Sequence, residues 1–238
     1  MKLAYDFHIH TGASPCGDES MTPNNIVNMA LLKELDAIAI TDHNTTANIK
    51  SVLEVARDTS LVIIPGMEVE TSEEFHVITL FEDIEQARQL QDIVYDKLPK
   101  LKNRRYIFGN QLIYNSQDDI VGEIDRLLLT ATMLSVYELV EIVREIGGVC
   151  YPAHIDRQSY SIISNLGLIP PDLDIVNLEI SRYCQKNSYI NKYPSKRIIQ
   201  SSDAHYLGDI LERVSYMEID KNKPKYWIEK LKRIKNVS

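Results

Sequence analysis

Short apolar segments alternate with amphipathic segments along this chain, and this alternation limits the possible folds more than any other feature. Segments typical of strands occupy residues 2–9, 36–41, 61–65, 75–81, 149–153, 174–180, 197–202 and 214–219. Helical periodicity covers 23–35, 46–59 and 135–146, and a last helix begins near Pro224. Strands that alternate with helices predict a largely parallel sheet. At 238 residues, an α/β barrel is the natural way to close it.

The region 84–132 interrupts this alternation. It is polar and mostly helical in pattern, with an irregular stretch around 109–116, and it contains no convincing buried strand. We expect a helical insertion there, acting as a lid or a dimer contact. The chain has no repeats, low-complexity segments or linkers, so we expect one domain over residues 1–238.

Composition excludes several classes of protein. Hydrophobic residues make up 44% and charged residues 25%, the balance of a globular protein with a full core, which excludes disorder and a coiled-coil rod. No apolar run approaches the ~20 residues of a membrane helix, and MKLAYDFHIH lacks a signal-peptide core, so we expect a cytoplasmic protein without a membrane partner. Three scattered cysteines do not suggest a disulfide framework. A net charge of −8 disfavours extended contact with nucleic acid.

The six histidines carry the strongest functional signal, because all lie in or just after an expected strand. They are His8, His10, His43, His76, His154 and His205. Glu68 and Asp203 follow strands in the same way, and the carboxyl ends of barrel strands meet at one rim. Imidazole and carboxylate groups together suit Zn, Mn or Fe.

Each of these residues also has a plainer explanation. His76 lies mid-strand and could be structural, and Glu68 follows Pro65-Gly66 and could be a solvated loop acid. Asp42 could bind a metal directly or orient a neighbouring imidazole. The cysteines are typical of small core residues without metal-pair spacing. The paired motifs His-X-His and Asp-X-His make a purely structural explanation of the whole set weak.

Six stretches, in order along the chain, resemble the PHP (polymerase and histidinol phosphatase) family of metal-dependent phosphoesterases. They are DFHIHTGASPCGDESMTP, AIAITDHN, IIPGMEVET, FHVITLF, GGVCYPAHIDR and SSDAHYLGD. The resemblance implies a distorted (β/α)7 barrel, similar to a TIM barrel, with two or three divalent ions at its carboxyl-terminal rim. One departure is Ile155, where many members have proline after the histidine that matches His154.

The resemblance also implies three metal positions. The first ion would be held by His8, His10, Glu68 and Asp203. Glu68 would bridge to a second ion, completed by His76 and His154. A third would take His43, His205 and an acid from the loop after His10, which we assign to Asp18, with Cys16 and Glu19 as alternatives.

Such a centre predicts hydrolysis of a phosphoester by a metal-activated water, without a serine or cysteine nucleophile. His205, if it is not fully used by a metal, or a metal-bound water could protonate the leaving oxygen. Arg157 is our first choice as phosphate anchor, because a guanidinium grips phosphate oxygens in pairs. The alternative is a surface arginine paired with Asp156 or with a loop acid. Arg182 and Lys186 are secondary candidates.

The leading functional hypothesis is hydrolysis of a small phosphomonoester or nucleotide. The first rival is an exonuclease that acts on nucleic-acid ends, for which the basic segment 97–105 could contact the strand. A second is a non-catalytic regulatory domain that has lost its metals. A third is metal-dependent C–N hydrolysis, disfavoured because the expected carboxylated lysine and ligand order are missing from the pattern.

Overall fold

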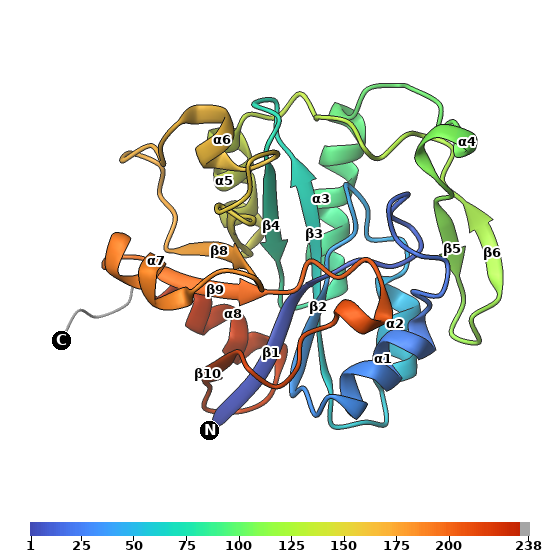
Figure 1. Ribbon diagram of the computed structural model, residues 1–238. Coiled ribbons are helices and arrows are strands. Elements are labelled where there is room, and N and C mark those ends of the chain that lie inside the picture. The colour runs from blue at the N-terminus through green and yellow to red at the C-terminus, as the bar shows by residue number, and fades with distance from the viewer. Residues whose placement is uncertain (234–238) are drawn as a thin grey trace.

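The computed structural model describes residues 1–233 and has a curled, mixed β-sheet at its centre (Figure 1). The strands of this sheet follow the order β10-β1-β2-β3-β4-β7. Their bounds are β1 Lys2–Ile9, β2 Ala37–Ile40, β3 Val62–Glu70, β4 His76–Leu80, β7 Val149–Pro152 and β10 Tyr216–Glu218. A separate parallel pair, β8 (Asn177–Ser181) and β9 (Arg197–Ser201), is in contact with β7 and β1. The α/β class is therefore confirmed.

The expectation of a largely parallel sheet is wrong for part of the molecule. The pairs β1–β2, β2–β3 and β8–β9 are parallel. However, β4 is antiparallel to both of its neighbours, and β10 is antiparallel to β1. Only residues 71–75 connect β3 to β4, which is too short for the crossover that parallel neighbours need. A closed ring of seven strands is not among the hydrogen-bonded sheets of residues 1–233.

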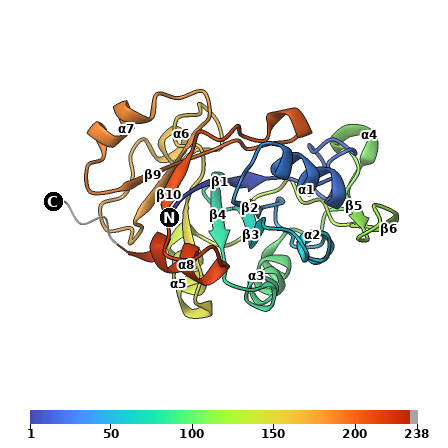
Figure 2. The same ribbon diagram turned by 90° about the horizontal axis from the view of Figure 1, so that it is seen from below.

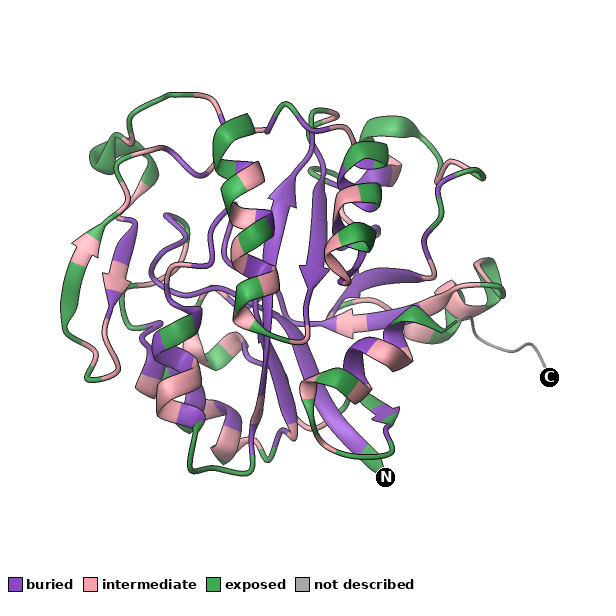
Figure 3. Ribbon diagram, turned by 180° about the vertical axis from the view of Figure 1, so that it is seen from behind, coloured by how far each residue is buried: buried purple, intermediate pink, exposed green. Residues whose placement is uncertain are grey.

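Helices cover the sheet, with exposed outer faces and buried inner faces (Figure 3). The longer ones are α1 Pro23–Leu32, α2 Ile49–Ala56, α3 Ile84–Lys97, α5 Val136–Ile146 and α8 Pro224–Lys232. Viewed from below, α2, α3, α5 and α8 lie together on one side of the strands (Figure 2). The short helices α6 (Ile162–Leu166) and α7 (Lys186–Lys192) were not anticipated. Within residues 1–233 no helix has the length and apolar character needed to cross a bilayer.

The helical insertion expected over 84–132 is only partly correct. Its first part, α3, is a core helix whose Ala87, Leu90 and Val94 are fully buried. The remainder is an edge lobe (residues 98–132) that contains α4 (Arg105–Phe108) and an antiparallel hairpin, β5 (Leu112–Tyr114) with β6 (Ile120–Glu123). Because β6 is exposed at three of its four positions, it lacks the buried apolar pattern that indicates a strand.

Strand β1 links the core to the candidate site. Tyr5 and Phe7 stack with ring centroids 4.3 Å apart, and Trp227 of α8 meets Phe7 edge-on at 5.3 Å. Successive side chains of a strand point to opposite faces, so the alternate residues His8 and His10 project away from this aromatic cluster. Burial of the aromatic side chains therefore fixes the direction in which both imidazoles point.

Candidate metal centre

Eight of the nine ligands expected from the sequence meet at one end of the central strands. They are His8, His10, His43, Glu68, His76, His154, Asp203 and His205, called here the histidine cluster. All are buried except His205, which is partly exposed. His76 belongs to this end because β4 runs antiparallel to β3, so its first residue pairs with Glu70, the last residue of β3.

Glu68 lies at the centre of the histidine cluster. Its Oε1 is 3.2 Å from His8 Nε2, 2.9 Å from His76 Nδ1 and 3.3 Å from His154 Nε2. Its Oε2 is 3.3 Å from His10 Nε2 and 3.0 Å from His43 Nδ1. Glu68 is part of β3 and is buried, so the alternative of a solvated loop acid is wrong.

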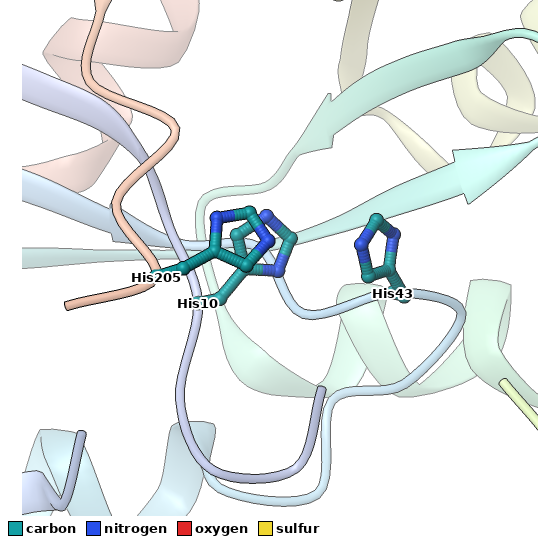
Figure 4. A group of neighbouring side chains, drawn as sticks. All are labelled: His10, His43 and His205. Atoms are coloured by element: carbon teal, nitrogen blue, oxygen red, sulfur yellow. The ribbon is translucent and has the colours of Figure 1, made fainter. Parts of the chain in front are cut away.

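Three sets of ligand atoms lie close enough together to share a cation. In each set the atoms are within 4.8 Å of one another: His8, His10, Glu68 and Asp203; His43, Glu68 and His76; and His10, His43 and His205. Figure 4 shows the third set, with the His10 and His205 rings overlapping and His43 beside them. The His10 and His205 ring centroids are 4.3 Å apart.

The donor atoms fit divalent metal ions. His8 Nε2 faces His10 Nε2 at 3.2 Å, although two unprotonated ring nitrogens would repel each other. Glu68 Oε2 and His154 Nδ1 are buried, and neither has a hydrogen-bond partner in the described part of the chain. Buried polar atoms without partners are costly, and a cation bound by Glu68 would satisfy its free oxygen. Imidazoles and carboxylates in this mixture suit Zn, Mn or Fe.

Electrostatic coupling shifts the pKa values within the cluster. Burial acts to raise the pKa of Glu68, but charge on His76, His8 and His43 outweighs it and holds that pKa well below its usual value. The pKa of Asp203 is likewise lowered against burial, mainly by His8 and His10. Burial lowers the pKa of His76 to about 4. Both carboxylates therefore stay ionised and able to bind a cation.

Two buried carboxylates outside the cluster orient its imidazoles. Asp42 accepts hydrogen bonds from Thr11 N and from Ser14 Oγ, and Ser14 Oγ is 2.9 Å from His10 Nδ1. Asp42 thus has the orienting role that the sequence left open. Glu179 Oε1 is 2.8 Å from His8 Nδ1 and accepts from His154 N. Sequence analysis missed the roles of Ser14 and Glu179, although an acid in the apolar strand 174–180 was a usable signal.

Backbone strain coincides with the cluster. His154 has φ 26° and Asp203 φ 54°, and Asn44, next to His43, has φ 50°. Such conformations are disfavoured for residues with a Cβ and persist where the surrounding structure enforces them, often at functional sites. His154 and Asp203 lie two residues past the ends of β7 and β9, so at these positions the strain accompanies the turning of side chains into the cluster.

The loop after His10 is arranged differently from the sequence prediction. Asp18 is not brought into the cluster: its backbone N–H reaches His205 O at 2.9 Å, but its carboxylate turns back to accept from Ser20 N. Glu19 also points away and accepts from Asn110. Cys16 Sγ instead lies 3.1 Å from His205 Nε2. Cys16 is exposed, although the atoms around its thiol partly desolvate it and so act to raise its pKa. The His43 and His205 imidazoles outweigh this and lower the pKa of Cys16 to about 5.

A small cavity of about 100 Å³ opens onto the cluster, and Arg157 and Tyr160 line it together with six cluster residues. Arg157 Nη1 is 2.5 Å from Asp203 Oδ2, and the Tyr160 ring stacks on His76. Asp156 instead accepts from Ser181, so it is not the partner of Arg157. The secondary candidates lie elsewhere, since Arg182 pairs with Asp209 and Lys186 lines a different cavity.

Comparison with known proteins agrees with this geometry. The family model described as "PHP domain" matches residues 6–150. The chain belongs to the PHP family. Similar proteins include the 5'-3' exoribonuclease Rnm of Salmonella typhimurium and that of Escherichia coli. Each is 39% identical over 87 residues, which are 34% of this chain and 29% of the relative. The chain thus aligns with less than a third of their length.

Solved structures show the same fold. The lesion-specific endonuclease PfuEndoQ from Pyrococcus furiosus superposes with a TM-score of 0.71 at 19% identity, over 98% of this chain and 56% of that one. An amidohydrolase from Chromobacterium violaceum gives 0.61 at 14% identity, over 95% of both chains. At these identities the likeness extends to the fold alone.

Proposed function

We propose that this chain is a metal-dependent phosphoesterase that hydrolyses a phosphodiester at the end of a nucleic-acid strand. The observation that carries the proposal is the convergence of five imidazoles on Glu68, beside a small cavity with Arg157 at its edge. The relatives named as exoribonucleases and as a lesion-specific endonuclease act on nucleic acids, which favours this substrate over the small phosphomonoester expected first.

In this proposal the protein residues divide among three ion positions. His8, His10, Glu68 and Asp203 would hold the first, Glu68 with His76 and His154 the second, and His43 and His205 would contribute to a third. Two or three divalent ions at these positions would neutralise charge on the phosphoester and supply a nucleophile from water. The distorted (β/α)7 barrel would be completed by β8 and β9 between β7 and β1. Residues 1–238 would act as one domain, since β1 and the segment after β9 share the site.

The remaining cavity residues bind and orient the substrate. The Arg157 guanidinium would exchange its contact with Asp203 for two phosphate oxygens, and it would donate one hydrogen bond to each. The Tyr160 ring holds His76 in place by stacking. His205 remains a predicted proton donor for the leaving oxygen, provided that its Nε2 is not taken by a metal.

A second candidate substrate is a small phosphomonoester or nucleotide. The cavity of about 100 Å³ favours it, because that space matches one phosphoryl group better than a stretch of polymer. The first candidate requires a phosphodiester next to a strand end, and the second requires a terminal phosphate. They differ in whether the bond broken links two nucleotides.

A substrate screen separates these possibilities. Purified protein with Mn, Zn or Fe is incubated with 5'-phosphorylated RNA and DNA oligonucleotides, nucleoside monophosphates and p-nitrophenyl phosphate. We expect stepwise release of mononucleotides from one end of an oligonucleotide. Release of inorganic phosphate alone would favour the small-substrate hypothesis, and absence of both metal and turnover would favour a binding domain.

Two variants test the cluster directly. His10→Ala and Asp203→Ala should each abolish turnover with an unchanged circular dichroism spectrum, because each removes an atom from the first metal position. Glu218→Gln, an exposed carboxylate on β10, is the matched control and should keep full activity. Full activity in either cluster variant would overturn the ligand assignment.

A further inference from the structure

The loop that carries Cys16 is fixed in place beside the histidine cluster. Ser14 O accepts a hydrogen bond from Gly17 N at 2.8 Å, which closes a four-residue turn with Pro15 at its second position, where proline is favoured. Gly17 is required, since a Cβ there would lie 2.5 Å from Thr11 O. Asp18 N bonds to His205 O and ties the far end of the loop to the segment after β9. The thiol is therefore held by backbone contacts on both sides.

His205 directs a nitrogen atom that could bind a metal, Nε2, toward this thiol. Its Nδ1 is 2.9 Å from Asp203 O, and a carbonyl oxygen can only accept a hydrogen bond, so Nδ1 carries the ring proton. The neutral ring then has its lone pair on Nε2, the atom that faces Cys16 Sγ at 3.1 Å. A backbone carbonyl that fixes the tautomer in this way is typical of metal-binding histidines.

A buried carboxylate oxygen of Glu68, near the same imidazoles, lacks a hydrogen-bond partner in the described part of the chain. Glu68 Oε2 is almost fully buried and has no hydrogen-bond partner among residues 1–233. It lies 3.3 Å from His10 Nε2 and 3.0 Å from His43 Nδ1, two of the three imidazoles in the group nearest Cys16. This oxygen points to a ligand on the Cys16 side of the cluster independently of the thiol.

We propose that Cys16 Sγ is a metal ligand that completes the His10, His43 and His205 group, in the place assigned to Asp18 from the sequence. The inference rests on the proposed metal centre. Binding would release the thiol proton to solvent and form a metal–sulfur bond. Thiolate is a soft ligand, so this position would favour zinc over manganese, whereas carboxylate ligands suit manganese.

Cobalt substitution tests this directly. The full chain is stripped of metal and titrated with Co²⁺, whose bond to a thiolate gives an intense ligand-to-metal charge-transfer band in the near ultraviolet. The wild-type protein should show the band, and Cys16→Ser should lose it while keeping the weaker visible bands of cobalt at the other positions. Cys184→Ser, which removes a thiol on the segment after β8, is the matched control and should keep the band.

A replacement variant adds a second readout. Cys16→Asp should restore ion binding at this position without the charge-transfer band, and it should shift the preference from zinc toward manganese in a competition titration. Cys16→Ser should bind one zinc ion at least about a hundredfold more weakly than wild type.

Each outcome decides the proposal. A charge-transfer band that persists in Cys16→Ser would exclude the thiol as a ligand. Visible cobalt bands in the wild type without any charge-transfer band would exclude it as well and leave the histidine metal centre standing. No cobalt binding by the wild type would overturn the metal centre and the thiol ligand together.

Discussion

The histidine cluster and the edge lobe (residues 98–132) are neighbours in space, but they differ in which kind of side chain is buried and which is exposed. Charged and polar side chains are buried in the cluster, where His8, His10 and Glu68 have no exposed surface. In the lobe, large apolar side chains are exposed, and Tyr106 and Ile107 are open to solvent. Burial of charge is costly and is sustained only by partners or bound ions, so the cluster is the region where a ligand has the most to contribute.

The two regions also differ in how the chain builds them. The cluster joins residues from both ends of the chain, such as His8 and Asp203, whose atoms are 3.1 Å apart. The lobe has hydrogen bonds within residues 98–132 and is tied to several neighbouring segments. These bonds include Leu112 N to Gly12 O of the site loop, Asn48 Nδ2 to Leu112 O and Asn44 Nδ2 to Leu128 O. We therefore expect substitutions in the cluster to affect metal binding strongly and substitutions in the lobe to act mildly, through the loop.

The largest effect is expected at Glu68. Glu68→Gln removes the carboxylate charge that five imidazoles share, so every proposed metal position loses a ligand or its counter-charge. Loss of several kcal/mol of stabilisation corresponds to a drop in turnover of about a thousandfold or more. Metal content by mass spectrometry and turnover in the same preparations check this. A variant that retains its metal and more than a tenth of the activity would show that Glu68 is not central.

A smaller effect is expected for the contacts that orient the ligands. Ser14→Ala removes the hydroxyl between Asp42 and His10, leaving the imidazole free to rotate and Asp42 with one donor fewer. Loss of such a contact lowers metal affinity by about 10–100-fold. Titration with zinc measures it, and Ser188→Ala, on exposed α7, is the matched control. Equal affinities in both variants would show that the Asp42 contact does not position His10.

The same contrast explains how much could be predicted from the sequence. Histidine and acid at strand ends indicated eight residues that meet in the structure, because histidine is rare, with six in 238 residues, and the spacing of its motifs is distinctive. Asp18 was misplaced because nothing in the sequence shows that its carboxylate folds back onto Ser20 N. The β5–β6 hairpin was missed because exposed strands carry little apolar periodicity. The antiparallel β4 was missed because strand direction depends on connection length more than on strand composition.

A still smaller effect is expected at the mouth of the cavity. Arg157→Ala removes the cation nearest the cluster, and loss of a hydrogen bond to a charged group weakens phosphate binding by about tenfold or more. We expect a higher KM with little change in kcat, measured by steady-state kinetics on an oligonucleotide. Arg182→Ala breaks an ion pair with Asp209 outside the cavity and should leave KM unchanged. A KM that does not move in Arg157→Ala would exclude it as the phosphate anchor.

The smallest effect is expected where the lobe meets the site loop. The Tyr114 hydroxyl donates to Glu19 O at 2.9 Å, and its ring fills the space that a Cβ on Gly12 would need. Tyr114→Phe keeps the ring and loses the hydrogen bond, so the free energy of unfolding should fall by about 1 kcal/mol. Urea denaturation measures this loss, with Tyr106→Phe, a fully exposed tyrosine of α4, as the control. Because the ring still supports the loop, zinc affinity should change less than in Ser14→Ala. A loss of zinc affinity as large as that of Ser14→Ala would mean that the lobe takes part in building the metal centre, and the division between the two regions would no longer hold.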